Sequence, residues 1–166
     1  MSDATARFAL PFIAPGQAQK ELFHNEALMR IDAALQPTVE AIAQDDPPAA
    51  PAVGQCWVVG AAPTGAWAGQ GGTIAAWSDG GWRFVAPLAG TTAWSRADGL
   101  FARYDGNRWI LGEIVGSRVI VGGVQVVGMQ QAAIAAPTGG SVIDVEARAT
   151  LSAIIAVLKS HGLTAM

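Results

Sequence analysis

Near the N-terminus, apolar residues recur at the spacing of a helix. The interval from Gln17 to Leu35 contains neither glycine nor proline, and both lie just outside it. Leu28, Ile31 and Leu35 fall on one stripe with a period of 3.6 residues, and His24 and Gln17 continue that stripe towards the N-terminus. The pattern predicts a helix that packs through its C-terminal half, with a polar stripe before it.

The middle of the chain has a different pattern, in which tryptophans stand among glycines at short intervals between residues 54 and 114. Two segments resemble each other, 72–82 and 99–109. In each, an aromatic residue leads into an Asp-Gly turn, and a tryptophan follows the aromatic residue five places later. This arrangement is typical of a β-hairpin with large side chains packed across it.

The two aromatic hairpins are expected to pack against each other as related halves of one antiparallel sheet unit. Ile74 and Phe101 should occupy equivalent interior positions, and Asp79 and Asp105 should lie in the turns. The side chains of both hairpins would then share one core.

The C-terminal part predicts one more hairpin and a second helix. The valine-rich run from Val119 to Val127 turns at Gly-Gly and is apolar enough to be buried on both faces. A helix should begin after Ser141 or Asp144 and end at His161, just before a glycine. Its apolar stripe has the spacing of a helix that packs along its length and consists of Ala147, Leu151, Ile154 and Leu158.

These elements predict an α+β fold with a helical segment over 1–46, a tryptophan-rich β domain over 52–115, an apolar hairpin over 116–136 and a C-terminal helix over 141–166. A proline-rich link over 45–51 ends regular structure between the first two.

Composition points to a partner. Of the 166 residues 51% are hydrophobic and only 14% are charged, which leaves more apolar surface than one small core hides. We therefore expect a homo-oligomer, either a trimer or a pentamer, in which copies meet through Leu151, Ile154 and Leu158 of the last helix and through Val124 and Val126 of the hairpin.

Charge and segment length exclude other partners. A net charge of −3 without a basic stripe argues against nucleic acid. No apolar run is long enough to insert into a membrane, and the N-terminus does not resemble a signal peptide. We expect a protein made in the cytoplasm.

Residues for catalysis or metal binding are few. One cysteine and two histidines supply neither a disulfide framework nor a metal motif, so we expect no enzyme activity, no metal and no cofactor. Gln17, His24 and Asn25 are expected to hydrogen-bond to backbone groups of a neighbouring segment or subunit. Pairs among Asp79, Asp98, Asp105 and Glu113 could serve a small polysaccharide hydrolase, although the turn positions of two of them favour capping.

Six tryptophans leave two interpretations open. The rings can pack across hairpins in the core. Alternatively, rings beside the turns can stack on sugars, as in a carbohydrate-binding module. The candidates for stacking flank the turns and are Trp77, Trp82, Tyr104 and Trp109.

Several segments are similar to one known family. The chain resembles, over nearly its whole length, a family of uncharacterised domains in phage-like particles and gene transfer agents. The residues that carry the resemblance are Asp32 and the segments 14–20, 24–28, 54–59, 63–69, 74–77, 130–134 and 144–148.

The resemblance implies a virion component assembled into such a particle, a fibre or head-spike protein that helps the particle engage the bacterial surface. Larger receptor-binding additions of the family are missing from this chain, which favours the base or adaptor of a spike or fibre. Its partners would be a capsid vertex protein or a fibre, with cell-surface polysaccharide as a further ligand.

Overall fold

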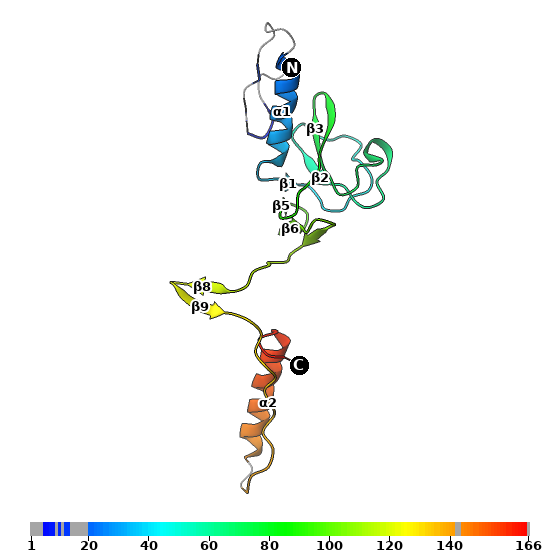
Figure 1. Cartoon of the computed structure of the whole chain (residues 1–166). Helices are drawn as coiled ribbons and strands as arrows, with labels where there is room; N and C mark the ends of the chain where they lie inside the picture. The colour runs from blue at the N-terminus through cyan, green and yellow to red at the C-terminus, as the bar shows by residue number, and fades with distance from the viewer. Residues whose placement is uncertain (1–4, 9, 11, 14–19, 142–143, 166) are drawn as a thin grey trace. The chain divides into compact units, whose positions relative to one another are not determined.

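The computed structural model describes residues 5–8, 10, 12–13, 20–141 and 144–165 (Figure 1). Contacts divide the chain into two compact units, Met1–Glu113 and Ile114–Met166. One helix stands near each end of the chain and mainly antiparallel strands fill the part between them, which confirms the predicted α+β class. The expected segments 1–46 and 52–115 are not separate bodies, because a strand of the first pairs with a strand of the second.

Helix α1 (Lys20–Ala34) forms where a helix was predicted, and residues 17–19 lie outside the described part of the chain. The predicted packing stripe is wrong. Ile31 is 50% exposed and His24 is also exposed, whereas Asp32 and Ala33 are buried. The helix is turned so that a partly polar stripe faces inwards, because Asp32 takes hydrogen bonds from the N-terminal segment.

The described residues of the first unit form two small sheets. In the three-stranded sheet, with order β2-β3-β4, all neighbours are antiparallel. Its strands are β2 (Cys56–Val58), β3 (Ile74–Ser78) and β4 (Gly81–Val85). A short 3₁₀ helix, η1 (Gly65–Trp67), lies in the connection between β2 and β3.

The four-stranded sheet has the order β1-β5-β6-β7. Its strands are β1 (Thr38–Val39), β5 (Thr92–Ser95), β6 (Leu100–Tyr104) and β7 (Trp109–Leu111). Strand β1 runs parallel to β5, and the other neighbours are antiparallel. The segment that follows α1 is therefore built into the edge of this sheet.

One core joins both sheets and helix α1. Its buried residues come from the helix, from β1 and β5, and from β2 and β3: Ala33, Val39, Cys56, Val58, Ile74, Ala76 and Ala93. Side chains alternate between the faces of a strand, so Ala75 of β3 points to a second cluster on the other face, where Trp57 and Trp67 are buried. Burial also raises the pKa of the Cys56 thiol to about 11.

Both aromatic hairpins form, β3–β4 and β6–β7, with Asp79 and Asp105 in the segments that connect their strands. They belong to different sheets, however, and not to one sheet unit. The predicted equivalence of Ile74 and Phe101 is also wrong, since Ile74 is 1% exposed and Phe101 is 61% exposed. Phe101 packs against Trp94 across β5 and β6 on the outer face, with ring centroids 4.9 Å apart.

Two alanines occupy the equivalent interior positions of these hairpins. Ala75 and Ala102 stand at matching places in the two repeated segments, and both are fully buried. The alternation of side chains along a strand forces the neighbouring residue of each outwards or onto the opposite face. The two segments therefore resemble each other in sequence and in local structure, and their equivalent buried residues are the alanines Ala75 and Ala102.

The second unit contains hairpin β8 (Val119–Val121) and β9 (Val124–Val127), and helix α2 (Val145–Ser160). Gly122 and Gly123 in the turn have positive φ angles of 57° and 81°, which glycine adopts without strain. The hairpin was expected to be buried on both faces. Within this chain all its strand residues are instead exposed, because the unit offers too little other structure to cover them.

The ends of helix α2 follow the prediction closely. The carboxylate of Asp144 accepts a hydrogen bond from the backbone N–H of Ala147 at 2.8 Å and so caps the first turn. Gly162, just past the last turn, has a φ of 68°. None of the helices that the structure describes has the length and apolar character needed to cross a membrane.

Candidate functional site

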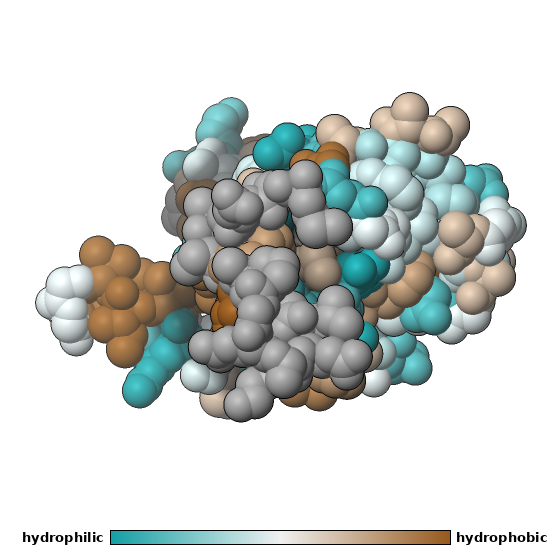
Figure 2. Space-filling model, turned by 90° about the horizontal axis from the view of Figure 1, so that it is seen from above, coloured by the Kyte–Doolittle hydropathy of each residue, from teal (hydrophilic) through white to brown (hydrophobic). Residues whose placement is uncertain are grey.

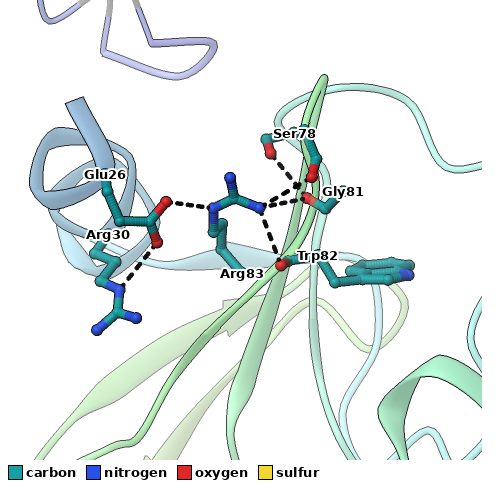
Figure 3. A network of polar contacts seen from close by, with 7 residues as sticks. Glu26, Arg30, Ser78, Gly81, Trp82 and Arg83 are labelled. Carbon is teal, nitrogen blue, oxygen red and sulfur yellow. Dashed lines mark hydrogen bonds and ion pairs between the residues drawn. The ribbon is translucent and has the colours of Figure 1, made fainter. Parts of the chain in front are cut away.

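A polar network fastens helix α1 to the β3–β4 hairpin (Figure 3). The carboxylate of Glu26 accepts hydrogen bonds from Nε of Arg83 at 2.7 Å and from Nε of Arg30 at 3.2 Å. The Nη1 of Arg83 donates, at 3.2–3.5 Å, to the carbonyl oxygens of Gly80, Gly81 and Trp82. The guanidinium group thus holds the turn of the hairpin and the helix together.

A second network ties the N-terminal segment to the end of α1. The buried carboxylate of Asp32 accepts hydrogen bonds from Thr5 Oγ1 at 2.7 Å, from the backbone N–H of Arg7 at 3.0 Å and from that of Phe8 at 2.7 Å. In return, the Arg7 guanidinium donates to the carbonyl oxygens of Asp32, Ala33 and Gln36. These carbonyls lie at the C-terminal end of the helix, where a cation is favoured.

The three residues of the expected polar signature have different surroundings. Asn25 accepts a hydrogen bond from the backbone N–H of Ile13 at 3.0 Å and donates one to its carbonyl oxygen at 3.3 Å, so it bonds to a neighbouring segment. His24 is exposed, not buried beside Leu28, because the helix turns a different stripe inwards. Gln17 lies outside the described residues. Asp32 and Glu26 make the side-chain bonds that hold this helix in place, and the pattern of apolar residues gave no sign of either.

The aromatic candidates lie in two separate pairs and not on one platform. Trp82 packs edge-on against Trp77, with ring centroids 4.9 Å apart, and also against the buried Trp67 at 5.1 Å. On the other sheet, Tyr104 and Trp109 lie 5.6 Å apart. All four are half-buried. A large part of the surface of each ring is therefore buried by packing within the protein.

Trp109 also connects the two sheets by a polar contact. Its indole N–H donates to the carbonyl oxygen of Gly72 at 2.8 Å, and its ring packs against the shared core. Trp109 thus joins the two sheets through one hydrogen bond and through the packing of its ring.

The acidic candidates are dispersed. Asp105 accepts hydrogen bonds from the backbone N–H groups of Asn107 at 2.7 Å and Arg108 at 2.8 Å, and these bonds lower the pKa of its carboxyl. Asp98 accepts one from Ser95 Oγ at 2.5 Å. Within the described ranges, no three His, Cys, Asp or Glu side chains gather in a way that could hold a metal ion.

The second unit presents an extensive apolar surface. Val124 is 64% exposed, Val126 56%, Leu151 48% and Ile154 51%, and Leu158 is half-buried. In Figure 2 the hairpin forms a group of brown, hydrophobic atoms at the left. Thr164 is the one buried residue among those described in this unit. The expected interface residues thus lie on the surface of the single chain.

The fold and these surfaces define a small α+β protein with two sheets on one core and an additional C-terminal unit whose apolar residues are uncovered. The chain belongs to the family described as "Protein of unknown function (DUF2793)", which matches residues 24–110. The match runs from the first turns of α1 to β7 and leaves the C-terminal unit outside it. A search of the curated proteins found no match.

Proposed function

We propose that the chain is a non-enzymatic structural component of a phage or gene transfer agent particle. It would act as the base or adaptor of a head spike or fibre that attaches the particle to the host surface. The observation that carries this proposal is the uncovered apolar surface of the C-terminal unit, which fits a protein that is completed by assembly.

The C-terminal unit needs a partner for physical reasons. A two-stranded hairpin is at best marginally stable in water, and so is an isolated helix of 16 residues. Both elements expose their large apolar side chains here. Burial of such side chains contributes about 1.5–3 kcal/mol each, so covering several of them would stabilise both elements.

The simplest partner is a second copy of the same chain, because it carries the same apolar surface and is made together with the first. Copies related by rotation about one axis can bring identical apolar surfaces together and close into a ring. A trimer would match the three-fold symmetry of most fibres, and a pentamer would match a five-fold capsid vertex. The first unit, which the family match covers, would then be displayed by the assembled C-terminal units.

Assembly can be tested on the full chain by sedimentation equilibrium at micromolar concentration. We expect a trimer or a pentamer for the natural sequence and a monomer for Ile154→Asp, which places a charge in the apolar stripe. The control is Ser152→Asp, which adds the same charge on another face of α2 and should leave the oligomer intact. A monomeric natural protein would contradict the proposal.

The place in a particle requires a separate test. Particles released by the source cells would be purified through a density gradient and analysed by mass spectrometry, and labelled antibodies would locate the chain by electron microscopy. We expect label at the vertices or at the tail. Particles that lack the chain while the cells contain it would refute the proposal.

A further inference from the structure

Strand β4 has one edge that pairs with no strand among the described residues. In the sheet order β2-β3-β4, strand β3 occupies the other edge of β4. The strand at the opposite end of the sheet, β2, is covered, because residues 40–44 hydrogen-bond to its backbone. Within the described part of the chain, this sheet therefore ends in an open strand only at β4.

The hydrogen bonds of β3 show which backbone groups of β4 point outwards. Trp77 uses both its N–H and its carbonyl oxygen to bond to the two residues that precede β2. Its partner across the hairpin, Trp82, is therefore in a non-hydrogen-bonded pair. Such pairs alternate with hydrogen-bonded ones along antiparallel strands, so the N–H and C=O groups of Trp82 and Phe84 point away from β3, whereas those of Arg83 point towards it.

One of these outward groups is already occupied. The carbonyl oxygen of Trp82 accepts a hydrogen bond from Nη1 of Arg83 at 3.2 Å. The N–H of Trp82 and both backbone groups of Phe84 have no hydrogen-bond partner in the part of the chain that the structure describes. Unpaired groups along the edge of a strand are able to pair with the backbone of another extended segment.

A groove of about 420 Å³ follows this edge. The described residues that line it come from β4, from α1 and from the connection before β3: Trp82, Arg83, Phe84, Glu26, Arg30 and Gln70. Consecutive side chains of a strand point to opposite faces, so a groove lined by three of them in a row passes over an edge of the strand. Glu26 and Arg83 also line the cavity between helix α1, the N-terminal segment and the β3–β4 hairpin, so their ion pair stands between the two spaces.

We propose that this groove binds an extended, acidic peptide segment of another protein, which adds a strand to the sheet beside β4. The backbone of the peptide pairs with the outward groups of Trp82 and Phe84. Its side chains alternate between the face of the two aromatic rings and the face of helix α1. The bonds to the backbone supply affinity, and the side chains that line the groove supply specificity.

Arg30 is the reason for an acidic partner. The single carboxylate of Glu26 is shared by Arg83 and Arg30, and Arg30 gives only its Nε to that pair (Figure 3). Its side chain is 62% exposed, and no described residue accepts a hydrogen bond from its two Nη atoms. A carboxylate on the peptide is able to accept these charge-assisted bonds. All the described lining residues lie in the first unit, so the site goes beyond the proposed function and does not depend on assembly through the C-terminal unit.

The test uses the full chain and a heptapeptide, blocked at both ends, of alternating threonine and valine with one central aspartate. A matched peptide carries lysine at the centre. Pairing through the backbone does not depend on sequence, so a peptide that readily forms a strand is a sufficient probe. We expect it to slow the hydrogen exchange of the Trp82 and Phe84 amides, measured by NMR, and to leave that of Arg83 unchanged. The aspartate peptide should bind about threefold more tightly than the lysine peptide.

Two N-methylated forms of the aspartate peptide test the strand pairing itself. Only alternate amides of a strand face its neighbour, so methylation of one alternate set should abolish binding and methylation of the other should leave it intact. Equal binding of the two forms would overturn the proposal, as would unchanged exchange at millimolar peptide. Exchange that slows in the protein alone as its concentration rises would place a second copy on this edge and would also overturn it.

A charge-reversing variant completes the test. Arg30→Glu should reverse the preference, so that the lysine peptide binds more tightly than the aspartate peptide. The control is Arg96→Glu, because Arg96 is 63% exposed, is likewise paired with one glutamate and lies outside the groove lining. It should leave the preference unchanged. An Arg30→Glu protein that still prefers the aspartate peptide would overturn the proposed charge of the partner.

Discussion

Polar residues determine how helix α1 packs. Asp32 is buried and accepts three hydrogen bonds, and Asn25 and Glu26 each bond to a different neighbouring segment. The cost of burying a polar group is offset once its hydrogen bonds are made, so such a residue can lie inside a small protein. This is why the apolar stripe through Ile31 did not predict the inner face.

The ionisation of Asp105 should make the stability of the folded protein depend on pH. Hydrogen bonds from two backbone N–H groups hold the pKa of Asp105 below its usual value of 3.8 in the folded protein. The stabilisation is therefore fully present above about pH 3.8 and is lost as the pH falls through the lower folded value.

Urea unfolding between pH 5 and pH 2 would measure this effect. We expect the natural protein to lose more stability over this interval than Asp105→Asn, whose amide does not titrate in this range. Parallel curves for the two proteins would show that the turn does not favour the charged carboxylate.

At the scale of elements, the ion pair between α1 and β4 joins parts of the chain that are far apart in sequence. Arg83 reaches Glu26 across 57 positions and is itself mostly covered, with 22% of its side chain exposed. Arg30, by contrast, pairs with the same carboxylate from the next turn of the helix, and 62% of its side chain is exposed.

These two arginines should differ in their contribution to stability. We expect Arg83→Gln to lower the free energy of unfolding by about 1–2 kcal/mol, because it leaves carbonyl oxygens and a carboxylate with fewer donors. Arg30→Gln should lower it by less than about 0.5 kcal/mol, since exposed pairs within a helix contribute little. Chemical denaturation of both variants measures the difference, and equal losses would show that the network does not fasten the helix.

At the scale of the molecule, the two units differ in how they are stabilised. The first buries residues from two sheets and a helix in one shared core. The second has exposed strands and a helix without buried residues. Its order should therefore depend on association, which is sensitive to protein concentration.

Hydrogen exchange at two protein concentrations tests this difference. We expect amides of β3 and β6 to exchange at rates that do not change with dilution. Amides of β9 and α2 should exchange faster as the protein is diluted below its dissociation constant. Slow exchange in α2 that is independent of concentration would mean that the single chain stabilises the second unit.

Local chemistry allowed the sequence by itself to predict the two helices and the three hairpins. The Asp144 cap and the glycine after the last turn bound helix α2, and the Asp-Gly and Gly-Gly turns place the hairpins. Each of these signals acts between residues that are neighbours in the chain, so it can be recognised without knowledge of the fold.

Only the tertiary structure decided which faces are buried and which strands share a sheet. The second hairpin shares a sheet with β5 and β1, whereas the first shares one with β2. Asp32 turned helix α1 by its bonds to the N-terminal segment. The cavity between helix α1, the N-terminal segment and the β3–β4 hairpin also exists only where these parts of the chain meet. These outcomes rest on contacts between residues distant in the chain, where many pairings satisfy the same local pattern and packing selects one.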